Sequence, residues 1–445
     1  MDYGLWTNKL STNNMKYKIL PILTLLASAV AAQVPAPAPP QSRPVLLTGA
    51  TLHVGNGTVI EQAAVAFDQG KITDAGPAAG APAAANGDKI DVSGQHIYPG
   101  LIQPNTQLGL KEVESVRATL DEREVGQLNP NVRALVAYNT DSDVLPTIRA
   151  NGVLLVQVTP QGGTISGQSS VMQLDAWNWE DAVLKADDGL HLSWPAIIPA
   201  SSPGMADPNA ADLARAREKL VQDLAVLFQE AAAYGKGSFS RQNFKLAAMQ
   251  GLFDGSKKLY LHAHNAKEII EGLRFAQKAG VKSMVLVGGR DAWRITGFLR
   301  DNQIPVILSG VHALPGYAGD DTDLPYKTPY LLQQAGILFG LDYSASLHGT
   351  RNLPFIAGTA VAHGLTKEQA LMAITANTAR ILGIDAQVGT LEAGKQATLV
   401  VSTGDLLDMR SNNVTHAFIQ GRKINLTDKQ KYLYQKFKEK YEAEK

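Results

Sequence analysis

The feature that most restricts the fold is an alternation of short apolar runs with longer amphipathic segments through the middle of the chain. Runs typical of buried parallel strands occupy residues 152–158, 258–264, 283–287, 305–309 and 337–341. Patterns typical of helices occupy residues 266–279, 291–300 and 330–335. This order predicts parallel strands joined by crossover helices, and therefore an α/β fold with a (β/α)8 TIM-like barrel over residues 98–386.

Both ends of the chain carry patterns typical of β-strands. Strand candidates lie at 45–52, 64–67, 71–72 and 89–92 before the barrel, and at 388–401 and 414–424 after it. Each set is too small to bury a core of its own. We therefore expect one small β-sandwich formed by both termini, built from residues 44–97 and 387–426, with the barrel inserted between its two parts.

The C-terminal residues 427–445 predict a charged helix. Thr427 and Gln430 have the spacing of a capping box, and Leu433, Phe437 and Tyr441 fall on one stripe. We expect this stripe to dock on the sandwich or on a second subunit rather than on a membrane.

The N-terminal residues 1–32 read as a leader and a secretory signal peptide. A basic region begins at Met15, an apolar run extends from Ile19 to Val30, and a small-x-small site ends at Ala31. A proline-rich linker follows over residues 33–43. These features predict cleavage near Ala31, a periplasmic or secreted protein, and no membrane attachment after cleavage.

The composition of the chain excludes several classes of function. The 445-residue chain has a net charge of +0, so it lacks the basic footprint of a nucleic-acid-binding protein. It contains no cysteine, which excludes disulfides, thiolate ligands and cysteine nucleophiles. The expected partners are a small-molecule substrate or ligand and, for a homo-oligomer, a second copy of the chain.

Two stretches carry a family resemblance. Pro99-Gly100-Leu101-Ile102 resembles the start of the first barrel strand of the amidohydrolase superfamily, whose motif continues Asp-x-His-x-His. Residues 352–383 resemble the last helix pair of its imidazolonepropionase-like and isoaspartyl-dipeptidase-like branch. The resemblance implies hydrolysis of a C–N bond in a cyclic amide, an amide or a dipeptide, with divalent zinc activating the water.

The resemblance also identifies family positions at which this chain carries other residues. Gln103 stands in place of the first-strand Asp, and Asn105 and Gln107 stand in place of the two first-strand His. Gln173 stands near the position of the residue that bridges two metals, and Gly288 near that of the sixth-strand His. Neutral amides are weak zinc ligands. We therefore expect an altered metal site with reduced zinc occupancy or none.

Other family positions are kept. The fifth-strand His corresponds to His262, and the eighth-strand Asp, which shuttles the proton, to Asp342. His264 faces the same side as His262, because the two are two residues apart on a strand. We expect His262 and Asp342 to be catalytic, and a weak or absent metal site to consist of His262, His264 and Asp342. The expected ligand-binding residues are Asn105, Gln107, Gln173, His264, His348 and Arg351.

Three functions remain open at this stage. The first is an exported hydrolase of non-peptide or dipeptide C–N bonds. The second is a catalytically silent family member that binds a small ligand or a protein. The third is a structural or interaction protein that uses the barrel only as a scaffold. Fold alone does not choose among them. One further group of polar residues follows the first strand and could line a pocket, although such a group is more often a solvated loop: Arg117, Asp121, Arg123, Glu124, Asn129 and Arg133.

Overall fold

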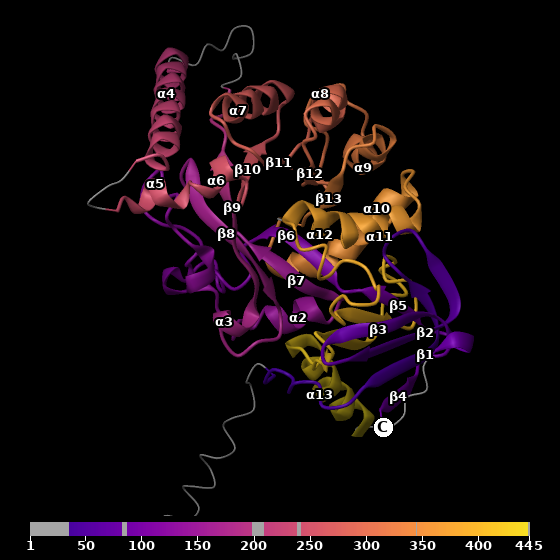
Figure 1. The fold of residues 1–445 in the computed structure, drawn as a ribbon. Coiled ribbons are helices and arrows are strands. Elements are labelled where there is room, and N and C mark those ends of the chain that lie inside the picture. The colour runs from indigo at the N-terminus through magenta and orange to yellow at the C-terminus, as the bar shows by residue number, and fades with distance from the viewer. Residues whose placement is uncertain (1–34, 82–86, 198–208, 238–241, 344, 444–445) are drawn as a thin grey trace, which may run out of the picture. The chain divides into compact units, whose positions relative to one another are not determined.

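The computed structural model describes residues 35–81, 87–197, 209–237, 242–343 and 345–443. The predicted signal peptide lies outside these residues. Residues 36–445 form one unit, which contains two eight-stranded sheets (Figure 1).

The central sheet is a nearly closed barrel. Its strands follow one another in chain order, β6 Leu101–Thr106, β7 Val153–Val158, β8 Ile165–Gln173, β9 Val183–Ser193, β10 Lys258–Ala263, β11 Met284–Gly288, β12 Val306–Leu308 and β13 Phe339–Leu341. Ile102, Tyr260, Val285 and Ile307 belong to one buried cluster, so the interior is a packed core. The strands predicted near residues 101, 152, 258, 283, 305 and 337 are confirmed.

One strand departs from the predicted all-parallel barrel. β8 is antiparallel to both β7 and β9, whereas the other neighbours in this sheet run parallel. Only residues 159–164 join β7 to β8, and residues 174–182 join β8 to β9, with the short helix α3 (Trp179–Ala182) between them. A parallel connection needs a crossover of a dozen or more residues, so these short links require the antiparallel arrangement.

A glutamine side chain bridges the first and last strands of the barrel. Gln103, on β6, accepts a hydrogen bond from the backbone N of Tyr343 at 3.1 Å and donates one to its carbonyl at 3.5 Å. Tyr343 follows β13, and Gln103 is fully buried. Gln103 therefore links the two edges where backbone pairing stops.

Helices cover the outside of the barrel, most densely over β10 to β13 (Figure 1). The remaining helices are α2 Leu145–Arg149, α4 Ala210–Tyr234, α5 Phe244–Ala248, α6 Gly251–Asp254, α7 Ala266–Lys278, α8 Thr296–Asp301, α9 Leu324–Gln334, α10 Leu353–Ala362, α11 Lys367–Ala373, α12 Ala376–Leu382 and α13 Lys429–Ala443. The sequence Asp207-Pro208 predicts a helix start just before α4, and these two residues lie outside the described residues.

The second sheet combines strands from both ends of the chain. It contains β1 Val45–His53, β2 Val59–Asp68, β3 Lys71–Pro77, β4 Asp88–Asp91, β5 His96–Pro99, β14 Leu399–Ser402, β15 Val414–Ile419 and β16 Arg422–Lys423. β5 pairs with β1 on one side and with β14 on the other. Phe67 and Phe418 meet edge to face in its core. That this terminal sheet forms a two-layered sandwich stays a prediction.

A buried ionic cluster joins the terminal sheet to the barrel. Asp175 accepts hydrogen bonds from Arg149 at 2.6 Å, from Arg422 at 3.0 Å and from the backbone N of Ala38 at 2.9 Å. Arg149 belongs to α2, Arg422 to β16, and Ala38 to the predicted linker. We call Arg149, Asp175 and Arg422 the Asp175 cluster, since this one carboxylate connects the barrel to both ends of the described chain.

Candidate functional site

Two neighbouring cavities open where the parallel barrel strands end. The larger, about 590 Å³, is lined by residues including His264, Ser309 and Asp342. The smaller, about 320 Å³, is lined by Asn105 and His262, and again by His264 and Ser309. Since the cavities share two residues, they form one mouth at the carboxyl ends of the strands, where barrel enzymes place their active sites.

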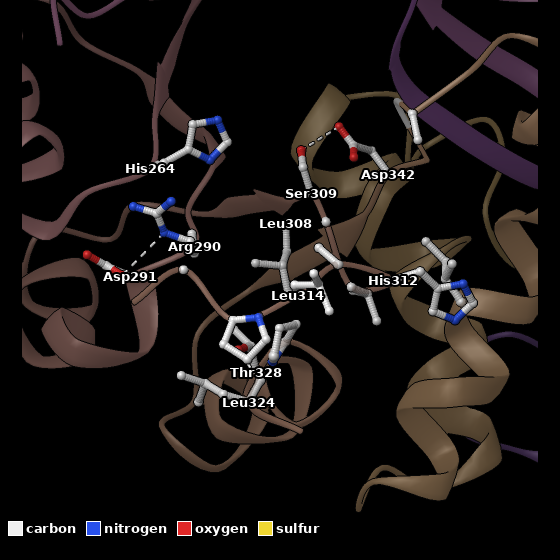
Figure 2. A pocket seen from close by; sticks show the side chains of 18 of the residues that line it. His264, Arg290, Asp291, Leu308, Ser309, His312, Leu314, Leu324, Thr328 and Asp342 are labelled. Carbon is white, nitrogen blue, oxygen red and sulfur yellow. Dashed lines mark hydrogen bonds and ion pairs between the residues drawn. The ribbon is translucent and has the colours of Figure 1, made fainter. Parts of the chain in front are cut away.

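Asp342 is the carboxylate of this mouth. It follows β13, is 1 % exposed, and accepts a hydrogen bond from Ser309 Oγ at 2.8 Å (Figure 2). It also accepts one from Asn105 Nδ2 at 2.9 Å. Both hydrogen bonds orient the carboxylate and stabilise its charged form. Asn105 reaches this position with a left-handed backbone, φ 50°, which asparagine tolerates better than most residues.

His262 and His191 form a second pair beside the smaller cavity. His191 Nδ1 lies 2.8 Å from His262 Nε2, and the His191 ring stacks on Tyr260 at 4.6 Å. Burial, with His264 nearby, lowers the pKa of His262 to about 4. Burial also lowers the pKa of His191 well below its usual value. Both rings are therefore neutral at pH 7.

Sequence reasoning missed His191. It lies on β9, where Leu190 and Leu192 face the outer core and His191 faces the barrel interior. Its Nε2 is buried without a hydrogen-bond partner among the described residues. The alternation Leu190-His191-Leu192 is typical of a strand with His191 on one face, and it is the sequence signal that would have identified this residue.

The larger cavity has one apolar side and one charged side (Figure 2). Leu308, Leu314 and Leu324 line the apolar side. Arg290 and Asp291 line the other, where Asp291 accepts hydrogen bonds from Tyr317 Oη at 2.9 Å and the first backbone N–H of α7 at 3.1 Å. A small, partly apolar ligand with one anionic or polar end matches this lining.

Several predicted ligand-binding residues lie elsewhere. Gln107 lines a separate cavity of about 150 Å³. Gln173 bonds Arg422 and the carbonyl of Asp181, and pairs with Leu155 near the start of β7. It is therefore at the opposite end of the barrel, and its assignment to the site is wrong: because β8 runs antiparallel, its last residue points away from the mouth.

His348 and Arg351 are also not brought to the mouth. Both are exposed on the short 3-10 helix His348–Asn352, and neither lines the two cavities described above. Tyr343 and Ala345 still line the larger cavity, but the 3-10 helix that follows does not, so closeness in sequence to Asp342 does not place these side chains beside the carboxylate.

The polar group after the first strand is mostly solvated. Asn129 is buried, and the other five residues, Arg117, Asp121, Arg123, Glu124 and Arg133, are exposed. None of the six lines the two mouth cavities. The solvated-loop interpretation therefore fits the structure.

The side chains of the mouth, as arranged here, do not fit a zinc site. Nε2 of His262 faces His191, and the Asn105 amide faces Asp342. Gly288 has φ 98°, and a Cβ there would lie 2.7 Å from the His264 ring. Among the described residues, no group of three or more His, Cys, Asp or Glu is placed to hold a metal ion.

Comparisons with known proteins agree with this architecture. The amidohydrolase family model matches residues 332–424. The imidazolonepropionase of Rhizorhabdus wittichii is 27% identical over 366 residues, which cover 78% of this chain and 90% of that protein. The imidazolonepropionase of Mesorhizobium japonicum is 28% identical over 376 residues, which cover 77% of this chain and 87% of that protein.

Solved structures show the same fold. An amidohydrolase from Thermotoga maritima superimposes with a TM-score of 0.75 at 23% identity, covering 86% of this chain and 99% of that one. A prolidase complexed with N-methylphosphonate-L-proline superimposes with a TM-score of 0.54 at 16% identity, covering 86% and 99%. The chain is therefore similar in sequence to imidazolonepropionase-like members of the amidohydrolase superfamily, and it shares the fold of solved amidohydrolases.

Proposed function

We propose that this protein hydrolyses a C–N bond of a small cyclic amide, amide or dipeptide at the mouth of the barrel. The observation that carries the proposal is Asp342, a buried carboxylate aimed into a cavity by Ser309 and Asn105. The two hydrogen bonds fix the orientation of the carboxylate at the cavity wall, as a group that takes a proton from water requires.

In the proposed step, Asp342 takes a proton from water as the water oxygen bonds to the carbonyl carbon. The protonated Asp342 then returns this proton to the leaving nitrogen as the C–N bond breaks. The apolar wall formed by Leu308, Leu314 and Leu324 binds the body of the substrate, and Arg290 is available for an anionic end.

We propose further that the metal site of the family is altered in this chain. In relatives of this type zinc supplies an activated water. The ligand positions here carry an amide at Asn105 and no side chain at Gly288, and His262 uses its Nε2 on His191. Elemental analysis of protein purified without chelator should therefore find clearly less than one zinc per chain. Zinc, manganese or iron that stays near stoichiometric through gel filtration would overturn this part.

The test of the hydrolase proposal compares two Asp→Asn variants in the same cavity. Asp342→Asn removes the proposed proton acceptor, whereas Asp320→Asn changes a lining carboxylate that pairs with Arg294. On a panel of cyclic amides, N-acyl amino acids and dipeptides, Asp342→Asn should lower kcat/KM by about 100-fold or more. Asp320→Asn should stay within a few-fold of wild type. Equal activity of the two variants would contradict the role of Asp342.

A second candidate function is ligand binding without catalysis. It is favoured by the internal pairing of the site: the Asn105 amide already bonds Asp342, and His262 already contacts His191. Thermal-shift measurements with the same panel separate the two functions. Stabilisation of the protein without turnover would identify a silent binding member of the family.

We propose that the mature protein is exported to the periplasm or outside the cell. The support is the basic region, apolar run and cleavage pattern of residues 15–31. The absence of cysteine is compatible with an oxidising compartment.

A further inference from the structure

The C-terminal helix α13 is fixed at its start and exposed along its length. Asp428 accepts a hydrogen bond from the backbone N of Lys431 at 2.8 Å, so Asp428 caps the helix and the predicted cap at Thr427 is wrong. Gln430 accepts a bond from Thr147 of α2 at 2.9 Å. Every residue from Lys429 to Ala443 is exposed. The prediction that the apolar stripe docks on the terminal sheet is therefore wrong.

Four large side chains share one face of α13. At 3.6 residues per turn, Leu433, Phe437, Tyr441 and Tyr434 fall within an arc of about 100°. Their exposed fractions are 38%, 49%, 57% and 70%. We call these four residues the α13 stripe. An apolar stripe of this width normally faces a core, so its exposure on a fixed helix indicates a binding surface.

The charges of α13 are arranged around this stripe. On the same helical projection, Lys429, Lys436 and Lys440 flank one side of the stripe, and Lys431 and Lys438 flank the other. Glu439 and Glu442 lie on the opposite face. The helix therefore carries five lysines and two glutamates, a net charge of +3, within a chain whose net charge is zero.

We propose that α13 binds the surface of an anionic phospholipid membrane. Lysines on both edges of an apolar stripe can extend to lipid phosphates while the stripe enters the headgroup region, and tyrosines are suited to that boundary. Among the described residues, no helix is both long and apolar enough to cross a membrane, so the contact is peripheral. This differs from the expectation from sequence that the mature chain has no membrane contact.

The same charges argue against a second copy of this chain as the occupant. Packing two α13 stripes face to face brings the lysine rows of one helix beside those of the other. Like charges at this separation destabilise such a pairing. An anionic surface instead attracts every lysine at the edge of the stripe, and each contributes about fivefold to partitioning.

The test is co-sedimentation of the purified mature protein with vesicles. Phosphatidylglycerol mixed with phosphatidylcholine should sediment the protein, pure phosphatidylcholine should sediment little, and raised salt should release it. The double variant Leu433→Ser, Phe437→Ser should bind about tenfold or more weakly. Tyr432→Ser is the matched control, because Tyr432 is 53% exposed but lies off the stripe. It should bind like wild type.

Three kinds of outcome would overturn the proposal. The first is no sedimentation with the anionic vesicles. The second is equal binding to both kinds of vesicle, or equal loss in the control and the double variant. The third is a stable dimer in analytical ultracentrifugation that the double variant dissolves, because a second copy would then cover the α13 stripe. Circular dichroism checks that each variant keeps its fold, as expected for exposed positions.

Discussion

The Asp175 cluster is predicted to hold the terminal sheet on the barrel. Asp175→Asn keeps the size of the side chain and removes its charge. The variant leaves Arg149 and Arg422 without their shared carboxylate, and these guanidinium groups are only 3% and 13% exposed. The new amide NH₂ would also face a donor, because Asp175 accepts from donors on both oxygens.

The expected loss is large for a single substitution. Removing one partner of a buried ion pair costs about 3–5 kcal/mol, because a buried charge is left uncompensated. Burial lowers the pKa of Arg149 and Asp175 opposes this effect, as expected for a buried cation beside its carboxylate partner. Since a whole protein is stable by about 5–15 kcal/mol, this loss would be a large part of the total.

Urea denaturation followed by tryptophan fluorescence and circular dichroism measures the free energy of unfolding. The matched control is Asp187→Asn, which breaks the pair of Asp187 with Arg133, 41% exposed. That variant should lose about 0–1 kcal/mol, because exposed pairs contribute little. A double-mutant cycle with Arg422→Gln should give strong coupling to Asp175 and none to Asp187.

A loss for Asp175→Asn no greater than that for Asp187→Asn would refute this reasoning. It would show that water or a rearrangement satisfies the two arginines, and that the cluster does not join the sheet to the barrel. Strong destabilisation without coupling to Arg422 would leave the contact with Arg149 as the cause and remove the connection to β16.

Three further predictions follow from the site and the chain ends. Gly288→Ala should destabilise the fold more than Gly280→Ala in thermal melts, because both glycines have positive φ but only position 288 lacks room for a Cβ; equal losses would show that the backbone yields there. The free energy of unfolding should fall as pH drops from about 6.5 towards 4, because the pKa of folded His262 is lowered and only the unfolded state gains the proton in that range; His262→Gln should flatten this profile, and an unchanged profile would assign the effect to other groups. N-terminal sequencing of the exported protein should find a start near Ala31, and recovery of residues 15–30 would contradict export by cleavage.

The family's ligand positions cannot be restored as a set by substitution. A histidine at Gly288 would need a Cβ where the His264 ring lies, and Gln173 lies at the opposite end of the barrel. The resemblance identified five altered family positions, but only Asn105 lies in the mouth with a side chain that a histidine could replace. Whether such a variant gains zinc is measurable by the same elemental analysis.

The sequence alone determined six of the eight barrel strands, the pairing of the two chain ends in one sheet, and the positions of His262 and Asp342 at strand ends. These features follow from local apolar periodicity and from motifs a few residues long. The partner of each polar group depended on tertiary structure. The direction of β8 moved Gln173 to the far end of the barrel, and His191 came beside His262 from 71 residues away. Such pairings depend on how distant strands lie together, which local patterns do not encode.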